Sequence, residues 1–153
     1  MKPLLVCVDF SDVTPRVMDE ARDLARTLTA GVHVIHVVPT PPDYMMYSPG
    51  ASMPMAAVAP DMRVETERLQ TLIAPLADAS VKAWYEVLEG QVIDEIIATA
   101  NRIGAGHIVM GSHGHSAFYN LVLGSVTEAI LRKVDVPLVI VPSPKPATKR
   151  RKS

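Results

Sequence analysis

Cysteine is nearly absent from this chain, which has 153 residues and a single cysteine, Cys7. One thiol excludes an internal disulfide framework and a metal site built from clustered cysteines. Long apolar runs are lacking too, because none reaches the roughly 18 residues that a membrane-spanning helix requires. The N-terminal segment meets the acidic Asp9 early and has no small-residue cleavage site, so it does not resemble a signal peptide. We therefore expect a cytoplasmic protein without a membrane span.

An excess of charge of either sign is also missing, since the formal net charge is −1. That balance hides an asymmetry, because five of the fifteen basic residues lie in the last nine positions. Residues 1–144 have ten basic and sixteen acidic side chains, a net of −6, which argues against nucleic-acid binding. Residues 145–153 are expected to form a basic, disordered tail, with weak contact to an acidic partner as the alternative.

Apolar residues are abundant at 48%, and charged residues make up 20%, as is typical of a soluble globular protein. The length predicts one domain, which we assign to residues 1–144. Residues 39–60 differ in composition, because they hold six of the thirteen prolines and four of the eight methionines. Such a stretch predicts a flexible flap, and whether it covers a ligand stays open.

Short apolar runs alternate with helical patterns along the chain. The runs that predict strands are Leu4–Val8, Val32–Val38, Val81–Leu88, His107–Met110 and Leu138–Val141. Between them, one helix is predicted with Thr14 as its N-cap and Gly31 as its end. A second helix is predicted to begin after Asp61, and a third to end near Gly104. A fourth is predicted from about Ser125 to Val134.

This alternation predicts an α/β fold: a single doubly wound, five-stranded parallel sheet of order 3-2-1-4-5 with helices on both faces. The third run alternates between apolar and polar residues, as is typical of an edge strand. Strands 1 and 4 would then lie side by side at the switch point, where such sheets bind ligands. Because Asp9 and Gly111 follow these strands, the topology alone predicts a site beside them.

The fifth strand would form the other edge of the sheet. Its sequence, Leu138 to Val141, is apolar on both faces, and a bare apolar edge promotes association. We therefore predict a homodimer that pairs this strand with its copy. Protection of the edge by the flanking prolines and the tail is the alternative.

Three of the eight glycines lie between residues 110 and 128, at the end of a strand and before a helix. These are Gly111, Gly114 and Gly124. Glycine lets a bound group approach the backbone, and free N–H groups at a helix start favour phosphate. However, Ser125 and Glu128 also form a Ser-x-x-Glu capping box, which would saturate those N–H groups. The residues alone leave a phosphate site and a plain capped turn equally open.

The spacing Gly-x-x-Gly-x9-Gly-Ser, beginning at Gly111 and ending at Ser125, resembles the nucleotide-binding signature of the universal stress protein family. Val-Asp-Phe-Ser at 8–11 and Gly-Ser-Val-Thr at 124–127 fit the same family, and the resemblance covers about residues 3–142. It implies a stress-response regulator that binds ATP, or ADP or AMP, and acts on a protein partner. Mg²⁺ would be carried by the triphosphate.

The resemblance also implies roles for individual residues. Asp9 would accept hydrogen bonds from ribose hydroxyls, and the backbone of Val37 would bond to the adenine edge. Further contacts to the nucleoside and phosphates are implied for Cys7, Val8, Met110, Gly111, Ser112, His113, Gly114, His115 and Ser116. The helix start implied to hold the β- and γ-phosphates comprises Gly124, Ser125, Val126 and Thr127.

Two other functions stay open. A slow ATPase would need added positive charge near the γ-phosphate, yet no lysine or arginine lies between Arg102 and Arg132. A protein-interaction module without a nucleotide would have no need of the glycines. The pair His113-x-His115 offers too few ligands for a metal site. No catalytic residue is predicted.

Overall fold

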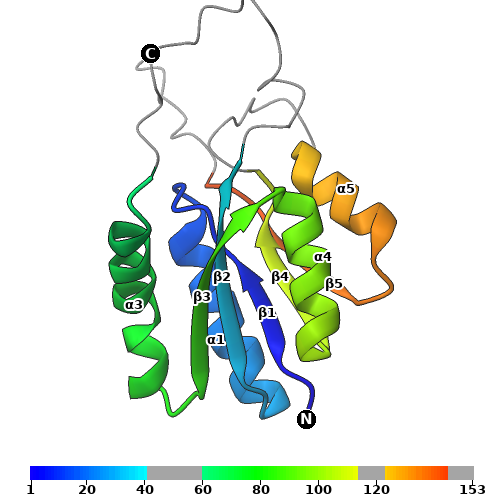
Figure 1. The fold of residues 1–153 in the computed structure, drawn as a ribbon. Coiled ribbons are helices and arrows are strands. Elements are labelled where there is room, and N and C mark those ends of the chain that lie inside the picture. Colours follow the sequence, from blue (N-terminus) through cyan, green and yellow to red (C-terminus); the bar gives the residue numbers. More distant parts are fainter. Residues whose placement is uncertain (41–59, 114–122, 145–153) are drawn as a thin grey trace, which may run out of the picture.

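The computed structural model describes residues 1–40, 60–113 and 123–144, and these form an α/β fold (Figure 1). The strands are β1 (Leu4–Cys7), β2 (Val32–Pro39), β3 (Ala83–Gly90), β4 (His107–Gly111) and β5 (Leu138–Val141). The helices are α1 (Thr14–Leu28), α3 (Met62–Asp78), α4 (Val92–Ile103) and α5 (Ser125–Lys133). Most of the predicted flap, the tail at 145–153, and Gly114, His115 and Ser116 lie outside the described residues.

The sheet has the order β3-β2-β1-β4-β5, and its strand pairs are all parallel. The predicted fold class and strand order are therefore confirmed. β1 is the central strand, since Leu4 is in register with Val32 of β2 and with His107 of β4. All connections in such a sheet cross over through helices, so the carboxyl ends of the strands share one edge of the molecule (Figure 1).

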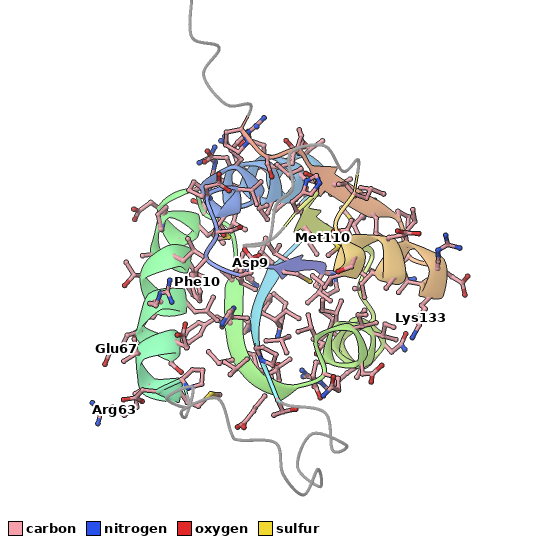
Figure 2. The ribbon with its side chains drawn as sticks, turned by 90° about the horizontal axis from the view of Figure 1, so that it is seen from above. Asp9, Phe10, Arg63, Glu67, Met110 and Lys133 are labelled. Atoms are coloured by element: carbon pink, nitrogen blue, oxygen red, sulfur yellow. The ribbon has the colours of Figure 1, made fainter. Side chains whose placement is uncertain are left out.

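Helices cover both faces of the sheet, as Figure 2 shows from above. On the face covered by α1 and α3, the core packs Leu4, Val6, Val34 and Leu69 among others. On the face covered by α4 and α5, a second core is formed. Its largest buried residues include Leu5, Ile35, Ile96, Ile108 and Ile130. Successive residues of β1 and β2 thus enter opposite cores, as the strand period of two requires.

The strands do not end level with one another. β1 ends at Cys7, one residue earlier than predicted, and Cys7 is in register with Ile35 of β2. β2 continues to Pro39, so its last residues extend past the end of β1. The chain after β1 turns away into α1, and this leaves room above the end of the central strand.

The ends of α1 differ from the prediction. Val13 is the N-cap, Thr14 is the first helical residue, and no side chain caps the helix within the described residues. At the other end, the sequence suggested that Gly31 would end the helix. Instead, Thr29 ends it in the left-handed conformation, with φ 51°. Gly31 has a different role, because a Cβ there would lie 2.5 Å from the Trp84 ring.

The two edge strands have different surroundings. β3 is half exposed, and its Trp84 is 52% exposed, as the alternating pattern predicted. β5 has the predicted bounds, and most of its apolar residues are only partly buried. Among the described strands, β5 is therefore an apolar edge with no neighbour on its outer side.

Candidate functional site

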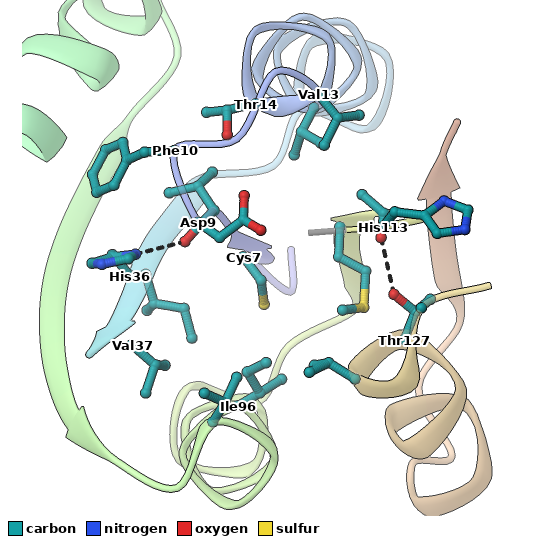
Figure 3. A pocket seen from close by; sticks show the side chains of 18 of the residues that line it. Cys7, Asp9, Phe10, Val13, Thr14, His36, Val37, Ile96, His113 and Thr127 are labelled. Atoms are coloured by element: carbon teal, nitrogen blue, oxygen red, sulfur yellow. Dashed lines mark hydrogen bonds between the residues drawn. The ribbon is translucent and has the colours of Figure 1, made fainter. Parts of the chain in front are cut away.

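A cavity of about 730 Å³ lies over the carboxyl ends of β1, β2 and β4 (Figure 3). Its size is within the range of small-molecule sites, about 300–1,000 Å³. The predicted site residues that line it are Cys7, Val8, Asp9, Val37, Met110, Gly111, His113, Gly124, Ser125, Val126 and Thr127. A cavity is therefore present beside the ends of β1 and β4, where the sheet topology predicted a site.

The floor of the cavity is apolar and belongs to the core under α4 and α5. Ile35 and Val37 contribute from β2, Met110 from β4, and Val92 and Ile96 from α4. The sequence showed the periodic apolar face of α4, but it gave no sign that one end of this face reaches a cavity. Such a surface suits a flat, apolar group.

Asp9 stands at the end of β1, near the middle of the molecule in Figure 2. Its Oδ1 accepts a hydrogen bond from the backbone N–H of Ser11 at 3.0 Å, which holds the carboxylate in a turn. The intervening Phe10 has φ 59°, a left-handed conformation that favours glycine. The carboxylate is thereby presented to the cavity, which Asp9 and Phe10 both line.

The start of α5 forms the wall opposite Phe10 in Figure 3. Gly124 is the N-cap, and no side chain of the described residues caps the helix. The first N–H that bonds back is that of Glu128, to the Gly124 carbonyl at 3.0 Å. The Glu128 carboxylate instead pairs with Arg132 at 2.8 Å. The capping-box alternative is therefore wrong, because Ser125 lies inside the helix and not at its cap.

Two hydrogen bonds join this helix start to β4. The Gly124 N–H donates to the Ser112 carbonyl at 2.7 Å, and the buried Thr127 hydroxyl donates to the Gly111 carbonyl at 3.0 Å. Because the Thr127 hydroxyl hydrogen is used in this way, an anion beside Thr127 would be met by its backbone N–H. The N–H groups of the first helical turn have no partner within the helix, and they make a site for negative charge.

Gly111 is required for packing at the end of β4. A Cβ there would lie 2.6 Å from Cγ1 of Val13, at the start of α1. The glycine thus lets α1 begin close to β4. The sequence pattern marked Gly111, but it did not show that Val13 is the neighbour.

Ser112 and His113 follow β4, and only His113 lines the cavity. The Ser112 hydroxyl accepts from the N–H of Ser143 at 3.2 Å and lies 3.0 Å from Nδ1 of His113. Figure 3 shows the His113 imidazole turned toward β5 and away from Asp9. The Ser112 side chain therefore holds the segment that follows β5, and His113 contacts the Ser112 hydroxyl.

Sequence reasoning missed a polar and aromatic cluster on the α3 side of the cavity. His36 Nδ1 donates to the Val8 carbonyl at 2.9 Å, and the His36 ring lies 4.6 Å from that of Phe10. Arg68 of α3 lies over Phe10, 3.9 Å from the ring centroid, and pairs with Glu65 at 3.1 Å. These residues come from three separate segments, so no local pattern could have joined them.

Cys7 lies on the cavity floor. Burial raises the pKa of its thiol to about 12. The thiol is therefore protonated at neutral pH, and protonated thiols are poor nucleophiles. Cys7 is therefore suited to packing against a ligand and not to nucleophilic chemistry.

Two further findings concern metals and membranes. The described residues contain no cluster of three histidine, cysteine, aspartate or glutamate side chains placed to hold a metal ion. No helix in the described part of the chain is long and apolar enough to cross a membrane.

The fold and the cavity together define a doubly wound α/β protein with a cavity at the switch point of the sheet. The universal stress protein family matches this chain over residues 1–142. The chain belongs to that family.

Two relatives match the chain over most of its length. The stress response protein NhaX of Bacillus subtilis is 30% identical over 159 residues, covering 90% of this chain and 96% of NhaX. A universal stress protein of Methanocaldococcus jannaschii is 28% identical over 145 residues, covering 94% of this chain and 84% of the relative.

Solved structures share the fold. The universal stress protein UspA of Lactobacillus plantarum matches with a TM-score of 0.76 at 19% identity, over 92% of this chain and 97% of UspA. A universal stress protein of Archaeoglobus fulgidus, in complex with dAMP, matches with a TM-score of 0.66 at 22% identity, over 92% and 98%. Another family member, in complex with cAMP, matches with a TM-score of 0.64 at 19% identity, over 94% and 98%.

Proposed function

We propose that this chain is a regulatory protein that binds ATP over the carboxyl ends of β1 and β4. The observation that carries the proposal is the start of α5, which lines the cavity without a side-chain cap among the described residues. Uncapped N–H groups at a helix start favour phosphate. The relatives in complex with dAMP and cAMP support an adenine nucleotide as the ligand class.

The three parts of the nucleotide match three parts of the cavity. The apolar floor beside Val37 and Ile96 suits adenine, with the Val37 backbone bonding to the edge of the base. Asp9 would accept from the ribose hydroxyls, and the helix start from Gly124 to Thr127 would hold the phosphates. Mg²⁺ would be bound by phosphate oxygens and water, which it prefers.

The cavity favours binding over turnover. Among its described lining residues, Arg68 is the sole lysine or arginine, and it is engaged by Phe10 and Glu65. Phe10 lies across the cavity from Thr127 in Figure 3, so this guanidinium is far from the proposed phosphate position. Phosphoryl transfer normally uses positive charge at the γ-phosphate. We therefore propose that ATP acts as a signal that a protein partner detects.

The binding proposal is tested by isothermal titration calorimetry on nucleotide-free protein. The ligands are ATP, ADP, AMP and adenosine, each with and without Mg²⁺. We expect affinity to fall as phosphates are removed, because each phosphate adds charge at the α5 start. The absence of binding to any of the four ligands by folded protein would contradict the proposal.

A homodimer through β5 is a second proposal. The carbonyls of Pro137 and Val141 face β4, so the backbone groups of Leu138 and Ile140 face outward. These outward groups can pair with the same strand of a second copy. Ile140→Pro removes an outward N–H and leaves the bonds to β4 in place.

Sedimentation velocity tests the dimer. We expect the unmodified chain and Ile140→Val to sediment as dimers, and Ile140→Pro to sediment as a monomer with a retained thermal transition. A monomeric unmodified chain at every concentration would show that the edge is not a dimer interface.

A further inference from the structure

The hydroxyl of Thr14 is unexplained by the fold. Thr14 lines the cavity and is 5% exposed, and its Oγ1 is buried with no hydrogen-bond partner among the described residues. Figure 3 shows this oxygen directed into the cavity, on the side where Asp9 lies. Buried polar atoms are nearly always paired, so an exception needs a reason.

Local structure does not use this hydroxyl. A threonine at the start of a helix commonly serves as its N-cap, but here Val13 holds that position. Thr14 is the first helical residue, and its backbone N–H already donates to the Ser11 carbonyl at 3.1 Å. The methyl group of valine would fill the same space as the hydroxyl, so packing does not require an oxygen at this position.

Asp9 and Thr14 both line the cavity, and their hydrogen-bonding chemistry is complementary. An ionised Asp9 carboxylate can only accept hydrogen bonds, whereas the Thr14 hydroxyl both donates and accepts. A sugar hydroxyl has one hydrogen to donate and lone pairs to accept with. Bound between the two, it would donate to Asp9 and accept from Thr14.

We propose that Thr14 recognises the sugar of the bound nucleotide, and that its hydroxyl bonds to a ribose hydroxyl. The site would thereby select against the deoxy analogue that lacks the bonded hydroxyl, because the buried Thr14 hydroxyl would be left without its partner. This inference rests on the proposed nucleotide binding.

The test is a double-mutant cycle between the protein and ligand hydroxyls. ATP, 2′-deoxyATP and 3′-deoxyATP are titrated calorimetrically into the unmodified chain, Thr14→Val and Thr14→Ser. We expect Thr14→Val to bind ATP about fivefold more weakly, the usual size of one neutral hydrogen bond. For the analogue that lacks the bonded hydroxyl, the affinity of Thr14→Val should stay within about twofold of that of the unmodified chain. Thr14→Ser keeps the hydroxyl and should retain affinity for ATP.

Thermal unfolding without ligand adds a second readout. Thr14→Val replaces an unpaired buried hydroxyl by a methyl group of similar shape. Because an unpaired buried hydroxyl is unfavourable, the Tm of the variant should equal or exceed that of the unmodified chain. A hydroxyl needed for folding would give the opposite result.

Four outcomes overturn the inference. Equal losses for ATP and both analogues would show a structural effect, and unchanged affinities would show that water or nothing meets the hydroxyl. A lower Tm in Thr14→Val would assign the hydroxyl to folding. If the unmodified chain binds none of the three nucleotides, the proposed function fails, and the inference falls with it.

Discussion

Replacing Gly124 by aspartate is expected to weaken ATP binding by about 100-fold, because like-charge juxtaposition costs several kcal/mol. Aspartate is a favoured N-cap residue, and its carboxylate would accept from the free N–H groups at the start of α5. The φ of −72° at Gly124 suits any residue, so the change needs no strained backbone. The variant supplies its own anion where the phosphates of ATP would bind.

Matched variants separate charge from size in this experiment. Gly124→Asn has the same shape without the charge, and Gly124→Ala measures the cost of a Cβ that lies 3.2 Å from the Ser112 carbonyl. We expect adenosine, which has no phosphate, to bind all three variants with similar affinity. Equal ATP affinity in Gly124→Asp and Gly124→Asn would place the phosphates elsewhere.

Replacing Asp9 by asparagine should weaken nucleotide binding by about 10- to 100-fold, since a hydrogen bond to a charged group contributes about 1.5–3 kcal/mol. The asparagine oxygen can still accept from the Ser11 N–H, so the turn after β1 should persist. The loss should be equal for ATP, AMP and adenosine, because the ribose is common to all three. Calorimetric titration of each ligand measures it.

The control for Asp9 lies in the same loop. Asp12 is exposed and does not line the cavity, so Asp12→Asn changes the net charge equally and should leave all three affinities unchanged. A loss in Asp9→Asn that grows with the number of phosphates would contradict ribose recognition. It would instead indicate that Asp9 acts through a metal ion bound to the phosphates.

The two substitutions are informative as a pair. Gly124→Asp is expected to act in proportion to phosphate charge, and Asp9→Asn independently of it. Adenosine is the ligand that separates them, since it retains the ribose and lacks the phosphates. A nucleotide bound in the reverse direction would make Asp9→Asn strengthen binding as phosphates are added, because the substitution would remove a like charge beside them.

The strand order could be predicted from the sequence because central and edge strands differ in burial. The pattern of apolar and polar residues shows how deeply each strand is buried. The alternating run became the exposed edge strand β3, and the continuous runs of β1, β2 and β4 became the central strands, while the apolar run of β5 lies at the other edge. The helix ends were less predictable. Thr29 and not Gly31 adopts the left-handed conformation after α1, since Gly31 is held against Trp84, a contact between distant parts of the chain.

Some residues of the candidate site could be predicted from the sequence, and others could not. Asp9, Gly111 and the start of α5 were identified because they follow strands or begin a helix, and parallel strands bring such points to one edge. Arg68 and Ile96 were missed because they come from the middle of helices. Which turn of a helix faces a cavity depends on how the helix packs.

The sequence by itself determined the class of fold, the strand order and the edge of the sheet where a ligand would lie. It could not decide between a capped turn and an open helix start, because Ser125 satisfies both patterns equally well. Only the tertiary structure decided this, by placing Gly124 at the cap and Ser125 within the helix. The physical reason is that a cap is defined by backbone torsion angles, which depend on the bonds that tie α5 to β4. The unpaired hydroxyl of Thr14 likewise became visible only once its surroundings were in place.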